Sequence, residues 1–113
     1  MADHLGGFEE MVLLAVCGLR DGAYAVPVQR QIEGEAGRKA TMGSVYATLD
    51  RLEKKGLLRS RMGPASGKPG GKAKRFYEPT GTGLAALRTT QESRAALAAR
   101  LTPDLAGRLG YGL

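Results

Sequence analysis

Several chemically distinctive residues are scarce in this chain of 113 residues, and their scarcity excludes whole classes of site. Cys17 is the only cysteine and His4 the only histidine, so one chain can form neither an internal disulfide nor a histidine–cysteine metal centre. No histidine base accompanies Ser44 in the pattern, which leaves serine-type nucleophilic catalysis without support. We therefore expect a protein that is not an enzyme and that uses no metal and no cofactor.

Long apolar runs are also missing. The longest, Met11–Cys17, is far too short to span a bilayer, and the first residues lack the basic segment that begins a signal peptide. The glycine- and lysine-rich stretch over 67–73 has neither the glycine spacing nor the following Ser or Thr of a phosphate-binding loop. A lone cysteine fits a reducing compartment. The expectation is a cytoplasmic protein without a membrane partner.

What the chain does have is positive charge concentrated in its middle. The net charge is +6, and eleven of the 17 basic residues fall within 38–75, which holds only two acidic residues. Residues 1–37 carry six acidic residues against two basic ones. Such concentration favours polyanions, either nucleic acid or an anionic membrane. A charge run alone usually marks a solvated surface, so the interpretation depends on how these residues are patterned.

The stretch from Thr41 to Lys55 is predicted to form a helix with two different faces. Val45, Leu49 and Leu52 recur at helical spacing and predict a face turned toward a core. The other face is small at its start and cationic at its end, which suits close approach to phosphates and base edges. To this second face we assign Ser44, Ala47, Thr48, Arg51, Lys54 and Lys55.

The segments around this helix predict a winged helix-turn-helix. Helices are expected over about 8–19 and 26–36, and a short polar turn at Gly37 leads into the third. After the third helix, the hydrophobic period changes to that of strands over 58–62 and 75–79, with Leu58, Ser60 and Met62 alternating against arginines. The connection between the strands is rich in glycine and lysine, so the pair is a hairpin with a cationic tip.

A final helix is predicted over about 82–101, with a tail from Gly107 that frays. The fold class is therefore mainly α with a small β-hairpin. We expect a winged helix-turn-helix at 1–80, followed by a C-terminal helix and frayed tail at 81–113.

The two-faced helix and the basic hairpin together indicate binding to double-stranded DNA. Such a helix enters the major groove, and a flexible cationic loop follows the backbone or enters the minor groove. Tyrosines beside the helix can donate to phosphates while their rings pack at the core edge, although a purely structural role accounts for them nearly as well. The predicted DNA contacts are Tyr24, Arg38, Lys39, Thr41, Ser44, Tyr46, Ala47, Thr48, Arg51, Lys54, Lys68, Lys72, Lys74 and Arg75.

Four stretches resemble the PadR family of bacterial transcriptional regulators: Leu13–Leu19, Gly22–Val28, Gly43–Leu58 and Lys74–Gly83. The resemblance implies a winged-helix homodimer that binds a pseudo-palindromic operator and usually represses. It also implies that the C-terminal helix makes most of the dimer interface with the first helix, and that a single C-terminal helix marks a short member of the family. The residues assigned to dimerisation are Leu14, Leu84, Leu87, Leu97 and Leu101.

The chain departs from the family pattern in three places. Ala25 stands where glycine is frequent, Pro27 stands where an acidic residue is common, and the hairpin tip is longer and richer in glycine and lysine. Two other functions stay open alongside DNA-binding regulation. One is a winged helix that binds another protein and never touches DNA. The other is a sensor whose pocket for an unknown small-molecule effector lies between two protomers.

Overall fold

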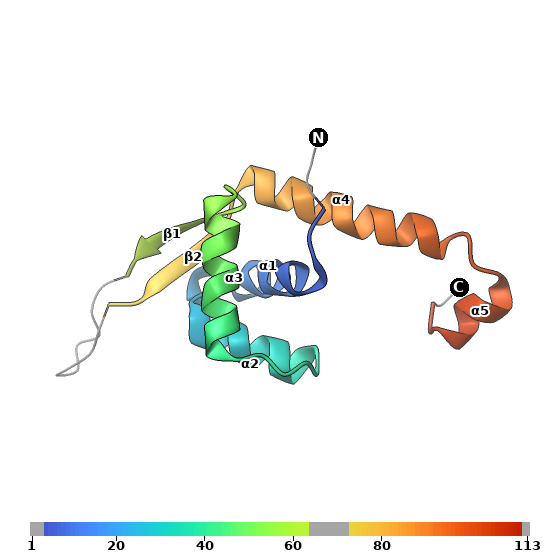
Figure 1. Cartoon of the computed structure of the whole chain (residues 1–113), viewed down its shortest axis with the longest axis horizontal. Helices are drawn as coiled ribbons and strands as arrows, with labels where there is room; N and C mark the ends of the chain where they lie inside the picture. Colours follow the sequence, from blue (N-terminus) through green and yellow to red (C-terminus); the bar gives the residue numbers. More distant parts are fainter. Residues whose placement is uncertain (1–3, 64–72, 112–113) are drawn as a thin grey trace.

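The computed structural model describes residues 4–63 and 73–111, and it is mainly helical with one antiparallel two-stranded hairpin (Figure 1). In chain order the elements are α1 (Gly7–Leu19), a 3-10 turn η1 (Arg20–Gly22), α2 (Ala25–Glu35), α3 (Met42–Lys54), β1 (Leu58–Met62), β2 (Arg75–Pro79), α4 (Gly81–Ala98) and α5 (Pro103–Arg108). The predicted fold class is confirmed, and the first three helices and both strands lie within a residue or two of their predicted positions. Within the described ranges, no helix is both long and apolar enough to cross a bilayer.

Helix α1 is the centre of the core. Its apolar residues exceed one stripe, and Val12, Leu13 and Val16 are all fully buried. The helix contacts α2, α3, α4 and β2, so it is covered on several sides (Figure 1). Burial of each such side chain contributes about 1.5–3 kcal/mol, which makes α1 the main source of cohesion in this small domain.

Helix α3 begins and ends at defined capping residues. At its start, the Thr41 hydroxyl accepts a hydrogen bond from the Ser44 N–H at 3.0 Å. At its end, Gly56 adopts a φ of +77°, and the N–H of Leu57 donates to the Leu52 carbonyl at 2.9 Å. This left-handed glycine cap turns the chain sharply, and β1 starts two residues later.

The hairpin is anchored to the helices through β2. Strands β1 and β2 pair in a register that sets Arg59 opposite Glu78 and Ser60 opposite Tyr77. The Tyr77 ring is buried, and its N–H donates to the Ala23 carbonyl at 2.8 Å. The hairpin of β1 and β2 is the wing of this fold, and its contact with Ala23 fixes it beside the start of α2.

Helix α4 packs on the core through its first half and then leaves it. Its last buried residue is Thr90, and the molecule is elongated, with extents of 59 × 31 × 22 Å. The radius of gyration is 16.5 Å, whereas a compact domain of this length has about 13 Å. The second half of α4 thus carries the C-terminal residues away from the winged helix (Figure 1).

The sequence predicted one C-terminal helix over about 82–101, but the structure has two helices in this region, and the first is shorter than predicted. Helix α4 stops at Ala98, and α5 follows because Thr102 caps it and Pro103 occupies its first turn. The predicted fraying from Gly107 is also wrong up to Tyr111. There the N–H of Tyr111 donates to the Ala106 carbonyl at 2.9 Å, across Gly110 with a φ of +84°.

Candidate nucleic-acid interface

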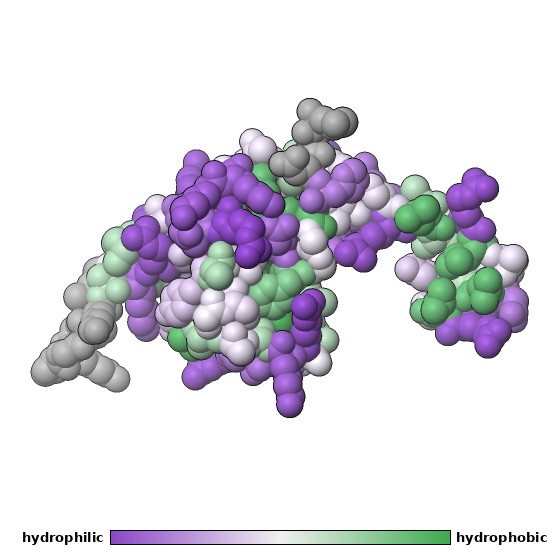
Figure 2. All heavy atoms as spheres, in the orientation of Figure 1, coloured by the Kyte–Doolittle hydropathy of each residue, from purple (hydrophilic) through white to green (hydrophobic). Residues whose placement is uncertain are grey.

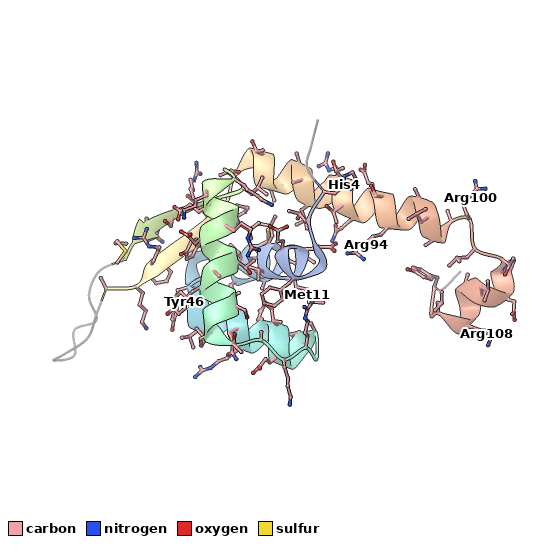
Figure 3. The ribbon with its side chains drawn as sticks, in the orientation of Figure 1. His4, Met11, Tyr46, Arg94, Arg100 and Arg108 are labelled. Carbon is pink, nitrogen blue, oxygen red and sulfur yellow. The ribbon has the colours of Figure 1, made fainter. Side chains whose placement is uncertain are left out.

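The outer face of α3 is exposed and the opposite face is fully buried. Val45, Leu49 and Leu52 have no exposed surface, as their spacing predicted. Tyr46 is 56% exposed and lies on the side of α3 that faces the hairpin (Figure 3). The other exposed residues of this face are Ser44, Ala47, Asp50, Arg51 and Lys54. The helix therefore presents short side chains at its start and basic ones at its end.

Thr48 was predicted to lie on the DNA face of α3, but it is buried. Only 3% of it is exposed, because it lies three residues after Val45 and four before Leu52 and so falls on the buried stripe. Its hydroxyl suggested an outward position, but the helical spacing determines where it lies. Thr48 belongs to the packing of α3 against the core and is removed from the candidate contacts.

The first turn of α3 is organised by two hydroxyl groups. The Thr41 hydroxyl lies 3.1 Å from the Ser44 hydroxyl, and the Ser44 hydroxyl also donates to the Thr41 carbonyl at 2.9 Å. Both residues are exposed. The free N–H groups of this helix start and its positive dipole end suit a phosphate, with the two hydroxyls beside them.

The last turns of α3 carry cations that already have acidic partners. Lys54 pairs with Asp50 at 2.9 Å, one helical turn earlier, as expected from their spacing. Lys55 lies 2.9 Å and Arg51 3.9 Å from the Glu9 carboxylate of α1. Glu9 thus holds the end of α3 against α1 and steers the Arg51 guanidinium, which stays half exposed.

The environment of Glu9 favours its charged form. Burial alone raises the pKa of this carboxyl group, but the Gly6 N–H and the Lys55 ammonium group donate hydrogen bonds to it. Together with the charge of Arg51, these contacts more than offset the burial, and the pKa of Glu9 is lowered. The contact between α1 and α3 is therefore ionic at neutral pH.

The outer end of the wing, where β1 ends at Met62 and β2 begins at Arg75, borders the same face. A hollow of about 500 Å³ lies between the start of α2, the exposed side of Tyr46 and the hairpin. The Tyr24 ring packs edge-on against Phe76, with centroids 5.5 Å apart, and the Lys74 ammonium group lies 4.5 Å above the Tyr24 ring. The side chains of Tyr24 and Lys74, two of the predicted DNA contacts, thus lie together beside α3.

Two wing residues add to this surface. Arg75, a predicted contact, is exposed and donates to the Ser60 hydroxyl at 2.8 Å. Met62 shares its side of β1 with the buried Leu58 by strand spacing, yet it is 54% exposed and lines the hollow beside Tyr46. The signal for Met62 was its place at the strand end next to the glycine-rich connection, beyond the reach of the core.

The remaining predicted contacts are less closely grouped. Arg38 and Lys39 are exposed in the turn between α2 and α3, but the Arg38 guanidinium lies 4.9 Å above the Phe8 ring of α1. That position sets it toward α1 and away from the wing. Lys68 and Lys72 lie outside the described residues. The structure therefore gathers the start of α3, Tyr24 and the outer end of the wing into one surface.

The predicted dimer residues divide into exposed and buried members. Leu14, Leu84 and Leu97 are strongly exposed, and Leu101 is half-buried. Leu87 was assigned to dimerisation, but only 7% of it is exposed and it packs within the protomer's own core. Its position on α4 faces the same direction as the buried Gly83, so it cannot contribute to an outer face.

A protein-family model matches residues 13–89, and its description is "Transcriptional regulator PadR-like family". No curated protein sequence shows significant similarity to the chain. The matched range contains α2, α3 and the hairpin, and it therefore includes the whole surface described above.

Solved structures share the fold. A PadR family transcriptional regulator from Eggerthella lenta is 26% identical, with a TM-score of 0.64, and the match covers 88% of this chain and 80% of that one. A PadR-like transcriptional regulator from Bacillus cereus is 19% identical, with a TM-score of 0.68 over 94% of this chain and 93% of that one. A PadR family regulator from Clostridium difficile is 18% identical, with a TM-score of 0.64 over 91% and 98%. The similarity thus extends over the winged helix and much of the C-terminal region.

Proposed function

Because the chain belongs to the PadR-like family of transcriptional regulators, we propose that it acts as a homodimeric repressor on a pseudo-palindromic operator. Members of this family are DNA-binding transcription factors and not enzymes. The observation that carries the proposal is the exposed surface formed by the outer face of α3 and the outer end of the wing. Every apolar residue of the opposite α3 stripe is buried, so this surface is the one that α3 offers to a partner.

In the proposed complex, α3 lies in the major groove with Ser44, Tyr46 and Ala47 nearest the base edges. Short side chains at the start of the helix allow close approach, and Arg51 and Lys54 lie near the flanking phosphates. Lys74 and Arg75 hold the backbone on the wing side. These residues are all exposed, and no acidic side chain lines the hollow between the wing and α3 in the described parts of the chain.

A twofold dimer would use the exposed leucines of α4 and α1. Leu84 and Leu97 on α4 and Leu14 on α1 are apolar and exposed. Two winged helices joined in this way would read half-sites about one helical turn, 34–36 Å, apart. An operator of that kind overlapping a promoter would exclude polymerase, which is why repression is the proposed outcome.

The wing contacts can be tested by the salt dependence of affinity. After footprinting has located the operator, Lys74→Ala and Arg75→Ala together should reduce the slope of log affinity against log salt by about 0.9 for each phosphate that the wing no longer neutralises. Arg59→Ala is the matched control, because Arg59 lies on the same hairpin but is paired with Glu78 at 2.6 Å. An unchanged slope in the double variant, or an equal change in Arg59→Ala, would contradict the proposed binding of phosphate by the wing.

Gel shifts distinguish DNA binding from a protein-binding winged helix. We expect the protein to shift DNA from its own upstream region with about a thousandfold or greater preference over random duplex, as is typical of specific binding. Deletion of the gene should raise transcription from that region. Equal affinity for all duplexes would leave the operator proposal without basis, and a fall in transcription would identify an activator.

A further inference from the structure

Helix α5 is a well-defined helix whose apolar side is uncovered. The Thr102 hydroxyl accepts from the Leu105 N–H at 3.3 Å at its start, and the glycine cap at Gly110 closes its end. Leu105 and Leu109 are strongly exposed, and so is Tyr111. Figure 2 shows hydrophobic residues gathered over α5 and the end of α4, well away from the core of the winged helix.

A helix this short does not persist by itself. Isolated helices below about 12 residues are marginal in water, and their stability in proteins comes from packing of an apolar face. Helix α5 has six residues, and no other described element packs extensively against it. The stability of α5 therefore depends on a surface that covers its leucines and that lies outside the winged helix of its own chain.

A groove of matching character lies between α1 and α2. It is a hollow of about 180 Å³ whose floor is apolar, formed by Met11, Leu14, Ala15, Ile32 and Ala36. Gln31 and Glu35 stand at its rim. Leu14 is 42% exposed on α1, the most buried helix of the molecule, so this is where the cover of α1 is incomplete. Met11 marks the position of the groove in Figure 3.

The chain's own α5 does not reach this groove. Helix α4 is continuous for 18 residues, and after Thr90 it carries α5 away from α1 and α2 (Figure 1). A second copy of the chain is different. Its α4, laid along α1 in the proposed twofold dimer, would project about 12 Å past its own core before α5 begins, at 1.5 Å per residue.

We propose that α5 of each protomer docks into the α1–α2 groove of its twofold partner, with Leu105 and Leu109 against Met11, Leu14 and Ile32. The interface is continuous with the one formed by α4, since Leu14 belongs to both. Arg108 on α5, which lies 3.8 Å from Asp104 of the same helix, is opposite in charge to Glu35 of the groove. This inference rests on the proposed homodimer and adds to it a second, reciprocal contact made by residues beyond α4.

Sedimentation equilibrium tests the docking. Leu105→Asp with Leu109→Asp should raise the dimer dissociation constant at least tenfold, because a charge would be placed in an apolar groove. Gly107→Asp is the matched control: it adds the same charge to the opposite side of α5, where a side chain would meet nothing within 4 Å. The control should change the constant less than twofold. An equal effect of both, or of neither, would overturn the docking.

Disulfide trapping tests the position. In a Cys17→Ser background, protein carrying Glu35→Cys is mixed with protein carrying Arg108→Cys and then oxidised, so that only cross-protomer pairs can link the two. We expect rapid formation of the mixed dimer, and little when Arg30→Cys, on another side of α2, replaces Glu35→Cys. Similar yields from both positions, or no mixed disulfide at all, would contradict the proposed position of α5.

The same measurements separate this inference from the homodimer on which it rests. A monomeric wild-type chain would refute both. A dimer that survives the α5 substitutions but dissociates with Leu97→Asp would leave the homodimer intact and refute the docking of α5. Circular dichroism of each variant checks folding, and we expect the helix signal of the winged helix to be retained because α5 lies outside its core.

Discussion

Gly83 is the position at which one methyl group should do most damage to this fold. A Cβ atom placed there would lie 2.0 Å from the Leu57 carbonyl oxygen and 2.9 Å from its carbonyl carbon. Both are backbone atoms just after the Gly56 cap, so no side-chain rotation can relieve the clash. Gly83→Ala therefore forces α4 away from the junction of α3 and β1.

The magnitude follows from two opposing terms. Overpacking of this kind costs typically 1–3 kcal/mol, and a backbone obstacle belongs at the upper end of that range. The higher helix propensity of alanine offsets about 1 kcal/mol of this cost. The expected net loss is about 2 kcal/mol of unfolding free energy, which corresponds to a fall in melting temperature of about 8–16 °C in a domain of this size.

Gly81→Ala is the matched control. It lies two residues earlier in the same first turn of α4, and a Cβ there meets nothing within 4 Å. That substitution should leave stability unchanged or raise it by about 0.4–1 kcal/mol. Thermal and urea unfolding followed by circular dichroism compare the two variants. If Gly83→Ala unfolds at the temperature of Gly81→Ala, α4 is not seated on Leu57 and the path of the C-terminal region is wrong.

Two further predictions concern the attachment of the N-terminal residues. The buried Thr90 hydroxyl accepts from the Leu5 N–H at 3.0 Å, so Thr90→Val should lower the unfolding free energy by about 1–3 kcal/mol, whereas Thr90→Ser should restore most of it in urea titrations. Glu9→Gln should cost about 1–2 kcal/mol at pH 7 by weakening the contact to Lys55. Because folding lowers the pKa of Glu9 from its ordinary 4.5, this stabilisation is complete above that value and is lost as the pH falls through the lowered one. The unfolding free energies of wild type and Glu9→Gln should therefore converge as the pH is lowered below 4.5, and a difference that stays constant throughout the acid range would contradict the ionic contact.

Periodicity predicted most of α3 and failed at one residue for a clear reason. The apolar residues Val45, Leu49 and Leu52 define the buried stripe, and geometry alone adds position 48 to it. Thr48 was assigned by its hydroxyl group, because a polar residue in a buried stripe gives no hydrophobic signal. A residue that lies three or four positions from buried apolar residues both before and after it belongs to the buried stripe, whatever its polarity.

The C-terminal error has a different origin. Thr102 followed by Pro103 is a helix start, and Gly110 is a helix stop, so the signals for α5 are local and present in the sequence. The prediction of one helix over about 82–101 did not use these signals and assigned the residues from Gly107 to a frayed tail. By contrast, the long-range partners of Glu9 follow only from packing, and spacing along the chain carried no information about them.

Ion pairs on α1 connect this helix both to α3, which forms the candidate nucleic-acid interface, and to α4, which leaves the core. Glu9 contacts Lys55 and Arg51 of α3, while the adjacent Glu10 pairs with Arg94 of α4 at 2.8 Å. Glu10 is buried, and Arg94 reaches α1 from the point where α4 leaves the core. Helices α3 and α4 are thus ion-paired to two adjacent residues of α1. In a dimer built on α4, the separation of the two α3 helices would be determined through α1, without passing through the hairpin.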